Sequence, residues 1–361
     1  MKDYTQKVDF HSHFLPPAYI EYLDKYEGPT PDSFPTPDWS LKDHMKEMDD
    51  LGVAFALISI SSPAVINAKD DAETLDYVRR INEEGASYVK KYPHRLGLMA
   101  ELPLPLVEDS VKEAKYALEK LGAYGFGLKT NYNSIYLGDP SFDPLMEYLN
   151  KKGALIAVHP TMPGALPKGV NKDFPIPAME FFTETTRTFV NMENHDLFAR
   201  YPDIKWVFPH AGAYLSLLDD RINMFKIFTK KAYPKARLDV YEDMKHVYFD
   251  LAGCPLPKQL QLLRKDVPMD HMFYGSDCPY TPKAACVALA GQLEDTDQLT
   301  DDEKYNIFTR NAVELLPQLK DHLDVKSNGD SKKKRGKKAG KGKRSFMGKA
   351  YNRVMSVISK I

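Results

Sequence analysis

Four histidines and one aspartate follow short apolar runs at separate places in the chain. His11 and His13 lie in VDFHSHF, His159 in LIAVHP, His210 in IKWVFPH and Asp277 in MFYGSDCP. Imidazole and carboxylate groups are common ligands of divalent metals. One such histidine alone is more often a hydrogen-bonded residue at a strand end, but the repeated pattern predicts a metal enzyme.

The apolar runs predict eight short strands. These are Lys7–His11, Ala54–Ser59, Leu96–Ala100, Gly125–Lys129, Leu155–His159, Ile204–His210, Val247–Leu251 and His271–Gly275. Apolar residues spaced by three and four predict helices between several of them. The clearest are Leu41–Leu51, Ala72–Tyr92, Ser110–Leu121 and Asp143–Lys152.

Alternating strands and helices predict an α/β fold, a (β/α)8 TIM barrel. The carboxyl ends of the strands meet on one face of such a barrel, so we expect the five residues to lie together there. Because they are two apart on a strand, His11 and His13 point to the same side.

Two long segments follow predicted strand ends, Phe14–Trp39 and Thr161–Phe182, and both are rich in proline and aromatic residues. They are either lids that exclude water from the site or ordinary surface loops. Cys278 adjoins Asp277. It is a candidate metal ligand or reactive thiol, although a small residue in the pocket wall is the simpler interpretation.

Charge divides the chain of 361 residues into two unlike parts. From Lys326 to the end there are thirteen Lys and Arg and one acid, a formal charge of +12. Because the whole chain carries −1, the remainder carries −13. We therefore expect a catalytic domain over 1–325, a disordered basic linker over 326–344 and a basic amphipathic helix over 345–361.

The basic C-terminal tail has three interpretations. It is a solvated tail, it associates with an anionic membrane surface, or its linker holds the phosphates of nucleic acid. No run of 18 apolar residues predicts a membrane span, and the N-terminus lacks an apolar signal core. With three cysteines and no CxxC spacing, we expect a cytoplasmic protein, peripheral at the inner membrane surface if the tail binds there.

Taken together, the motifs resemble the amidohydrolase superfamily, in its branch of metal-dependent decarboxylases. That branch includes aminocarboxymuconate semialdehyde, γ-resorcylate and 6-methylsalicylate decarboxylases. The similarity runs from about Val8 to Pro317. Its specific stretches are VDFHSHFLPPAYI (8–20), KEMDDLGVAFALIS (46–59), ETTRTFVNMENHDLFARYPDIKWVFPHAGAYLSLLDDRI (184–222), FYGSDCPYTP (273–282) and TRNAVELLP (309–317).

The resemblance implies a role for each candidate site residue. His11, His13, His159 and Asp277 would bind one divalent metal, with zinc the first expectation and manganese the second. The resemblance makes His210 a nearby acid/base residue rather than a ligand. Arg221, eleven residues later, matches an arginine that reaches the site of a neighbouring subunit and binds a substrate carboxylate there, which implies a homodimer.

The chain departs from its relatives at two places. The muconate-semialdehyde enzymes carry arginine in the segment corresponding to 38–48, where this chain has Lys42, His44 and Lys46, which argues against a second carboxylate clamp. Resorcylate enzymes often begin with Glu-x-His, whereas this chain has His-x-His. LPPAYI and ETTRTF look closest to the methylsalicylate group.

The implied activity is non-oxidative decarboxylation of an ortho-hydroxybenzoate-type acid, with 6-methylsalicylate the leading substrate. Asp277 and His210 would move the proton that replaces the carboxylate. No nucleotide-binding GxGxxG or GxxxxGK[ST] occurs in a strand–helix context. The alternative is a metal-dependent hydrolase of C–N or C–O bonds. In its two-metal form, a modified Lys129 at the end of the fourth strand would bridge the ions.

Overall fold

The computed structural model describes residues 4–170, 174–234, 236–237 and 239–323. Eight strands of this part form one sheet in the order β1-β2-β3-β4-β7-β8-β9-β10, and neighbouring strands pair in parallel. They are β1 Lys7–His13, β2 Val53–Ser59, β3 Leu96–Ala100, β4 Gly125–Lys129, β7 Leu155–His159, β8 Lys205–Phe208, β9 Tyr248–Asp250 and β10 Met272–Phe273. The predicted TIM barrel is confirmed.

The barrel closes between its first and last strands through the segment that follows β10. Phe10 N donates to the Tyr274 carbonyl at 2.9 Å, and His13 N donates to the Cys278 carbonyl at 2.8 Å. Asp277 N returns a bond to the backbone of β1. These bonds and two isolated parallel bridges form the seam of the barrel, so the segment that carries Asp277 also closes the fold.

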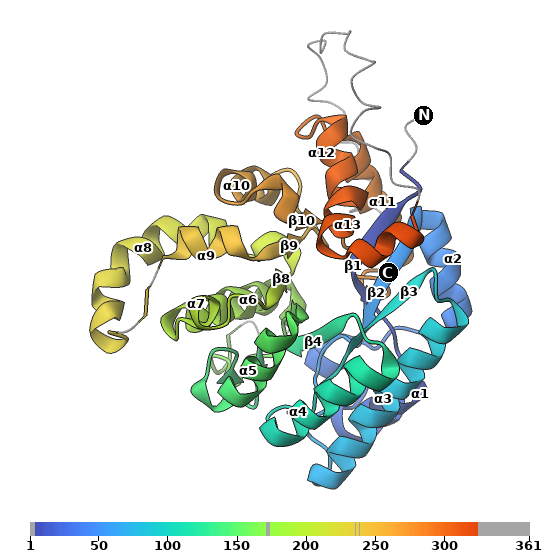
Figure 1. The fold of residues 1–361 in the computed structure, drawn as a ribbon, viewed down its shortest axis with the longest axis horizontal. Coiled ribbons are helices and arrows are strands. Elements are labelled where there is room, and N and C mark those ends of the chain that lie inside the picture. Colours follow the sequence, from blue (N-terminus) through green and yellow to red (C-terminus); the bar gives the residue numbers. More distant parts are fainter. Residues whose placement is uncertain (1–3, 171–173, 235, 238, 324–361) are drawn as a thin grey trace.

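Helices surround the sheet in Figure 1. They are α1 Pro17–Tyr22, α2 Leu41–Leu51, α3 Asp71–Lys91, α4 Val107–Tyr116, α5 Asp143–Lys152, α6 Ile176–Asn194, α7 Leu197–Arg200, α8 Leu215–Ala232, α9 Val240–His246, α10 Gln259–Asp266, α11 Lys283–Asp295, α12 Asp301–Tyr305 and α13 Asn311–Leu315. A small antiparallel pair, β5 Asn131–Tyr132 and β6 Ile135–Tyr136, follows β4.

Local sequence explains where helices such as α2 begin and end. The Ser40 side chain accepts a hydrogen bond from Asp43 N at the first turn, and Gly52 ends the helix in the left-handed conformation. His44, Met48 and Leu51 form its buried stripe at spacings of four and three. This periodicity predicts the helix over the same residues, 41–51.

A β-bulge in β1 sets which side chains enter the barrel. Asp9 pairs with Ala56 and Ser12 with Ile58, so β1 carries one extra residue between these two pairs. Residues alternate between faces on a regular strand. The extra residue lets the apolar Phe10 fill the interior while His11 also faces inward near the rim.

The barrel has an apolar core on each side of its wall. Outward side chains such as Ala56 and Ile58 pack under the surrounding helices, whereas inward ones such as Phe55 and Leu57 pack with residues of α13. The inner apolar cluster fills one end of the barrel, which leaves the strand carboxyl ends for polar residues.

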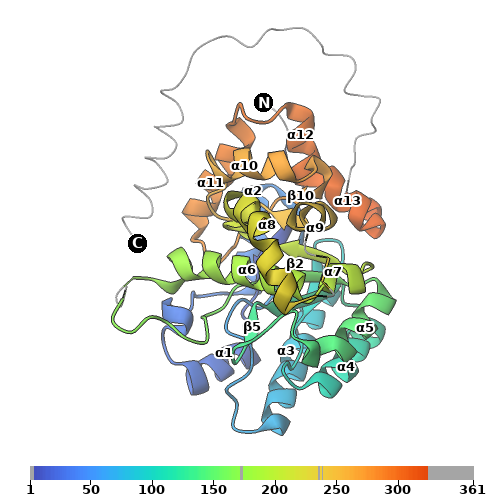
Figure 2. The same cartoon turned by 90° about the vertical axis from the view of Figure 1, so that its left-hand side faces the viewer.

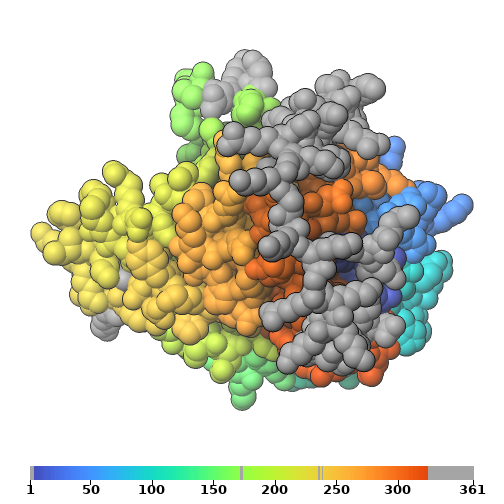
Figure 3. Space-filling view, turned by 90° about the horizontal axis from the view of Figure 1, so that it is seen from above, coloured from blue at the N-terminus to red at the C-terminus, as the bar shows by residue number. Residues whose placement is uncertain are grey.

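Helix α8 projects from the barrel, at the left of Figure 1 and nearest the viewer in Figure 2. Of its residues only Leu215 and Asp219 are buried. Seen from above in Figure 3, the helix stands away from the barrel. No helix within the described ranges is long and apolar enough to cross a membrane. The predicted linker and amphipathic helix of the tail lie outside the described residues.

Candidate metal centre

Four of the predicted residues meet at the carboxyl ends of the strands. His11 and His13 lie at the end of β1, His159 ends β7, and Asp277 follows β10 by four residues. One ligand atom from each lies within 4.8 Å of all the others. The three histidines are between 1% and 6% exposed. The convergence predicted from the sequence is confirmed, and we call these four residues the metal cluster.

The outer nitrogens of the three histidines bind oxygen atoms. His11 Nδ1 lies 2.9 Å from a carboxylate oxygen of Asp250, and His13 Nδ1 lies 3.3 Å from the Ser59 carbonyl. His159 Nδ1 lies 2.6 Å from the carbonyl of the next residue. Because these oxygens accept hydrogen bonds, they assign a proton to each Nδ1 and leave Nε2 as the nitrogen that faces the other ligands.

The inner nitrogens fit a bound cation. Nε2 of His11 and Nε2 of His13 are buried without a hydrogen-bond partner, and each lies 3.4 Å from an Asp277 oxygen. Buried polar atoms normally have partners. Three imidazole lone pairs and one carboxylate directed at one point form a donor set for a divalent metal.

The electrostatics of the metal cluster favour a positive charge on the His11 ring and neutral rings at His13 and His159. Burial opposes charging of His11, but the carboxylates of Asp250 and Asp277 outweigh it and hold its pKa well above the usual range. Burial lowers the pKa of His13 to about 4 and that of His159 well below its ordinary value. Burial alone would raise the pKa of Asp277, yet the close approach of His11 and His13 holds it well below its usual range.

Sequence reasoning missed Asp250, the last residue of β9. One carboxylate oxygen faces His11 Nδ1, and the other accepts hydrogen bonds from His210 N at 3.1 Å and Ala252 N at 3.0 Å. A carboxylate that fixes a ligand histidine is a usual companion of a metal site. Its signal in the sequence was the same as for the ligands, a polar residue ending an apolar strand.

His210 lies beside the metal cluster without belonging to it. It follows β8 in a tight turn with φ of +56°. Its ring centroid is 5.1 Å from that of His11, and its other face stacks on Phe182 at 5.6 Å. His210 Nδ1 is buried without a hydrogen-bond partner. This position suits an acid/base group next to the metal, and that role stays a prediction.

Aromatic side chains surround the histidines, and we call them the aromatic collar. The collar consists of Phe34, Phe181, Phe182 and Tyr280. Tyr280 lies edge-on to His13 at 5.7 Å, and Phe181 lies edge-on to His159 at 5.9 Å. Both predicted insertions thus place aromatic residues at the site. Flat apolar walls around a polar centre suit a planar aromatic ligand.

Lys129, the candidate bridge between two metals, is engaged elsewhere. Its Nζ lies 2.9 Å from a Glu101 carboxylate oxygen, and both side chains are at most 1% exposed. The described residues contain one group of His, Cys, Asp or Glu with the spacing of metal ligands. These contacts favour a single metal over a lysine-bridged pair.

Arg221 does not contact the metal cluster of its own chain in the described structure. It lies exposed on α8, with its guanidinium 5.1 Å from the centre of the Phe225 ring. Its role across a subunit interface stays a prediction. In the segment 38–48, Lys46 pairs with Asp50 at the surface and His44 is buried against Trp39.

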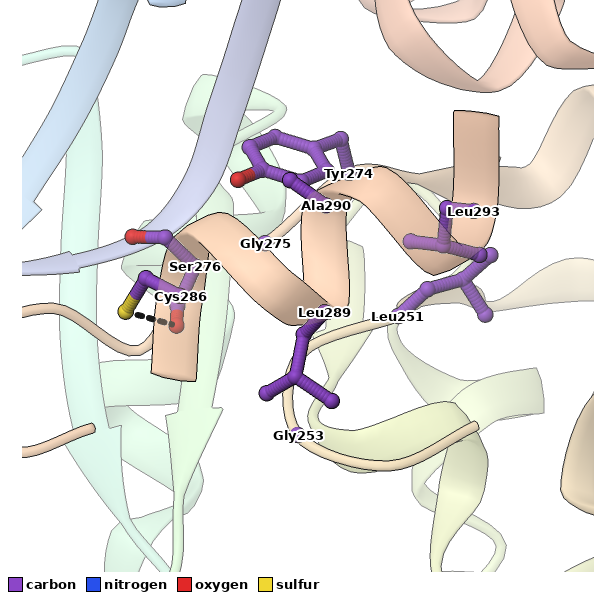
Figure 4. Close-up of a pocket in the computed structure, with 9 residues that line it drawn as sticks. All are labelled: Leu251, Gly253, Tyr274, Gly275, Ser276, Cys286, Leu289, Ala290 and Leu293. Carbon is purple, nitrogen blue, oxygen red and sulfur yellow. Dashed lines mark hydrogen bonds between the residues drawn. The ribbon is translucent and has the colours of Figure 1, made fainter. Parts of the chain in front are cut away.

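Cys278 is buried beside Asp277 but is not part of the metal cluster. Its neighbour Cys286, on α11, donates through Sγ to the Ser276 carbonyl at 3.4 Å. Figure 4 shows this contact at the edge of a small cavity behind the loop. Its walls are mostly apolar and include Leu251, Tyr274, Leu289, Ala290 and Leu293. The two buried thiols therefore pack beneath the segment 274–278, which carries the ligand Asp277.

The metal cluster generates a direct prediction of stoichiometry. We expect about one divalent metal per chain by elemental analysis, and near loss of it in His13→Ala and Asp277→Ala, since each removes one of four ligands. His246→Ala, at an exposed histidine on α9, is the control and should keep its metal. Full occupancy in both ligand variants would refute the site, and two metals per chain would favour the Lys129-bridged arrangement.

Comparison with known proteins agrees with this geometry. A family model described as amidohydrolase matches residues 8–318. Decarboxylase yanB of Aspergillus niger is 31% identical over 89% of this chain and 90% of the relative. The 6-methylsalicylic acid decarboxylase of Penicillium expansum is 29% identical over 88% of this chain and 98% of the relative. The crystal structure of an amidohydrolase II superposes with a TM-score of 0.82 at 41% identity, covering 86% of this chain and all of the other. Because the family model spans residues 8–318 and the ligand set lies at the strand ends of a TIM barrel, the chain belongs to the amidohydrolase family.

Proposed function

We propose that the protein is a metal-dependent, non-oxidative decarboxylase of an ortho-hydroxybenzoate-type acid, with 6-methylsalicylate as the leading substrate. The convergence of three imidazole nitrogens and one carboxylate inside the aromatic collar carries this proposal. Relatives with the names decarboxylase and 6-methylsalicylic acid decarboxylase support the reaction class.

The proposed reaction replaces a carboxylate on the ring with a proton. Protonation of the carbon that bears the carboxylate precedes cleavage of the C–C bond, and release of CO2 restores aromaticity. The metal would supply Lewis-acid stabilisation to the ortho oxygen and fix the carboxylate. Asp277, within the metal cluster, would carry the proton to the ring carbon. His210, next to His11, would relay that proton.

Ligand chemistry supports zinc as the resident metal. His11, His13, His159 and Asp277 offer three nitrogen donors and one oxygen donor. Zinc accepts such a mixed, four-coordinate set. Manganese, which favours oxygen-rich and higher-coordinate sites, is the second candidate.

The role of His210 can be separated from metal binding. His210→Ala should lower kcat by about 10²–10⁴, as expected for loss of an acid/base group, while the metal stays bound. CO2 release from 6-methylsalicylate and related acids, with and without NAD, measures the activity. If no salicylate or muconate semialdehyde releases CO2 while an amide or lactone is hydrolysed, the hydrolase alternative replaces this proposal.

We further propose a homodimer formed through α8. The helix exposes a set of large apolar side chains, of which Leu217 is 65% and Ile227 72% exposed. The others are Met224, Phe225 and Phe228. Exposed apolar residues gathered on one projecting helix are typical of a surface covered by a partner. Arg221 lies among them and would bind the substrate carboxylate in the partner's site.

Subunit complementation tests the shared site. Arg221→Ala and His210→Ala should each be nearly inactive alone. Mixing them by co-expression should restore about a quarter of the wild-type activity, because random pairing gives half heterodimers, each with one intact site. Phe228→Asp in both chains should abolish the restoration along with dimerisation. If a verified heterodimer of the two variants shows no restored activity, Arg221 does not act in the partner's site.

For the tail we propose weak association with anionic membranes, with catalysis independent of it. Its charge of +12 provides the attraction, at roughly 1 kcal/mol per basic residue near an anionic leaflet, and added salt screens it. A chain ending at Val325 should keep its metal and activity but lose co-sedimentation with anionic liposomes. Neutral liposomes are the control. Equal sedimentation of both chains would reject the membrane role. If the full chain instead retards RNA or DNA in a gel, nucleic-acid binding is favoured.

A further inference from the structure

Asp32 is a buried carboxylate on the insertion after β1. It lies in the short turn Pro31–Ser33 with φ of +49° and is 9% exposed. The Thr161 hydroxyl donates to one of its oxygens at 3.1 Å, and Ser62 and the backbone of Met162 also hydrogen-bond to it. These partners come from the loops after β2 and β7. Asp32 therefore joins three of the loops around the mouth of the site.

Neighbouring rings connect this carboxylate to the metal cluster. Phe34, two residues after Asp32, contacts Tyr280 at 6.4 Å between ring centroids, and Tyr280 contacts His13 at 5.7 Å. The Tyr280 hydroxyl is hydrogen-bonded to Ser61. Burial first, and then the charges of Asp32 and Asp277, raise the pKa of Tyr280. Asp32 thus lies within electrostatic reach of this side of the aromatic collar.

The charge of Asp32 has no compensating cation. Within the described ranges no ion pair joins it to a Lys or Arg. Burial raises the pKa of Asp32, hydrogen bonds from Ser62, Thr161 and the Met162 backbone lower it, and the nearby charge of Glu27 adds to the rise. Its hydrogen bonds come from neutral hydroxyl and N–H groups. A buried, unpaired negative charge repels a second anion nearby more strongly than it would in water.

We propose that Asp32 is a specificity-determining residue that restricts the site to aromatic monocarboxylates by repelling a second carboxylate on the ring. The inference rests on the proposed function, since it assumes that an aromatic acid binds at the metal cluster. Lys42 and Lys46 are exposed on α2. A second carboxylate therefore meets an acid at the Tyr280 side of the collar and gains no cation from the segment 38–48.

The test compares ligands that differ in charge and not in shape. Salicylates carrying either a carboxylate or a carboxamide at ring positions 3, 4 or 5 are titrated calorimetrically into the full, metal-loaded chain. The His210→Ala background keeps turnover slow. At one ring position or more, the amide should bind roughly 10- to 100-fold more tightly than the acid. Asp32→Asn, which keeps an oxygen acceptor for Thr161, should remove most of that preference.

Two controls separate charge from structure. Glu27→Gln removes a nearby charge whose carboxylate contacts Tyr22 and Asn67, and it should leave the preference unchanged. Asp32→Ala should weaken the binding of both the acid and the amide, because it also breaks the contact to Thr161. This loss comes in addition to any change in the ratio of their affinities. If Asp32→Asn leaves the ratio unchanged, Asp32 is only a clamp between loops and the inference is overturned. If no salicylate binds to the metal-loaded chain, the proposed function fails with it.

Discussion

The arrangement of the site depends on the hydrogen bond between Asp250 and His11. It joins β9 to β1 across the barrel interior and fixes which His11 nitrogen faces the metal cluster. The same carboxylate holds the backbone of His210 in its left-handed turn. A buried carboxylate is tolerated only with a full set of donors, so each partner of Asp250 constrains the others. Ligand geometry and the position of the acid/base candidate therefore share one anchor.

Burial, more than any single charge, keeps the His13 and His159 rings neutral. It is the largest cause of the lowered pKa values of His13 and His159, and the ammonium of Lys129 acts in the same direction. Lys129 is itself held by Glu101, whose backbone bonds to the Asn82 side chain on α3. Buried ion pairs contribute little net stability, but they require a defined arrangement of the two charged groups. The pair therefore fixes the position of the Lys129 ammonium on this side of the barrel.

The sequence allowed the barrel and the metal cluster to be predicted because both depend on local patterns. Strand-sized apolar runs and strand-end ligands such as His159 need only the rule that parallel strands end on one face. Asp250 also ends a strand, but the predicted strand ran one residue further, to Leu251, and so placed this carboxylate inside an apolar run instead of at its end. The bulge in β1 and the left-handed turn at Asp32 arise from tertiary packing. The aromatic collar also depends on how two insertions fold back over the rim.

The seam of the barrel has a consequence for the order in which the molecule is made. His11 accepts a hydrogen bond from Ser276, 265 positions later, and Asp277 reaches the histidines only when this segment is in place. On the ribosome, β1 emerges before the other seven strands of the barrel, and it pairs with its last neighbour only after residues 274–278 have been made. Newly made polypeptide thus passes through elongation with an open barrel edge and an incomplete ligand set. Closure of the barrel and completion of the ligand set therefore occur together, once residues 272–278 pair with β1.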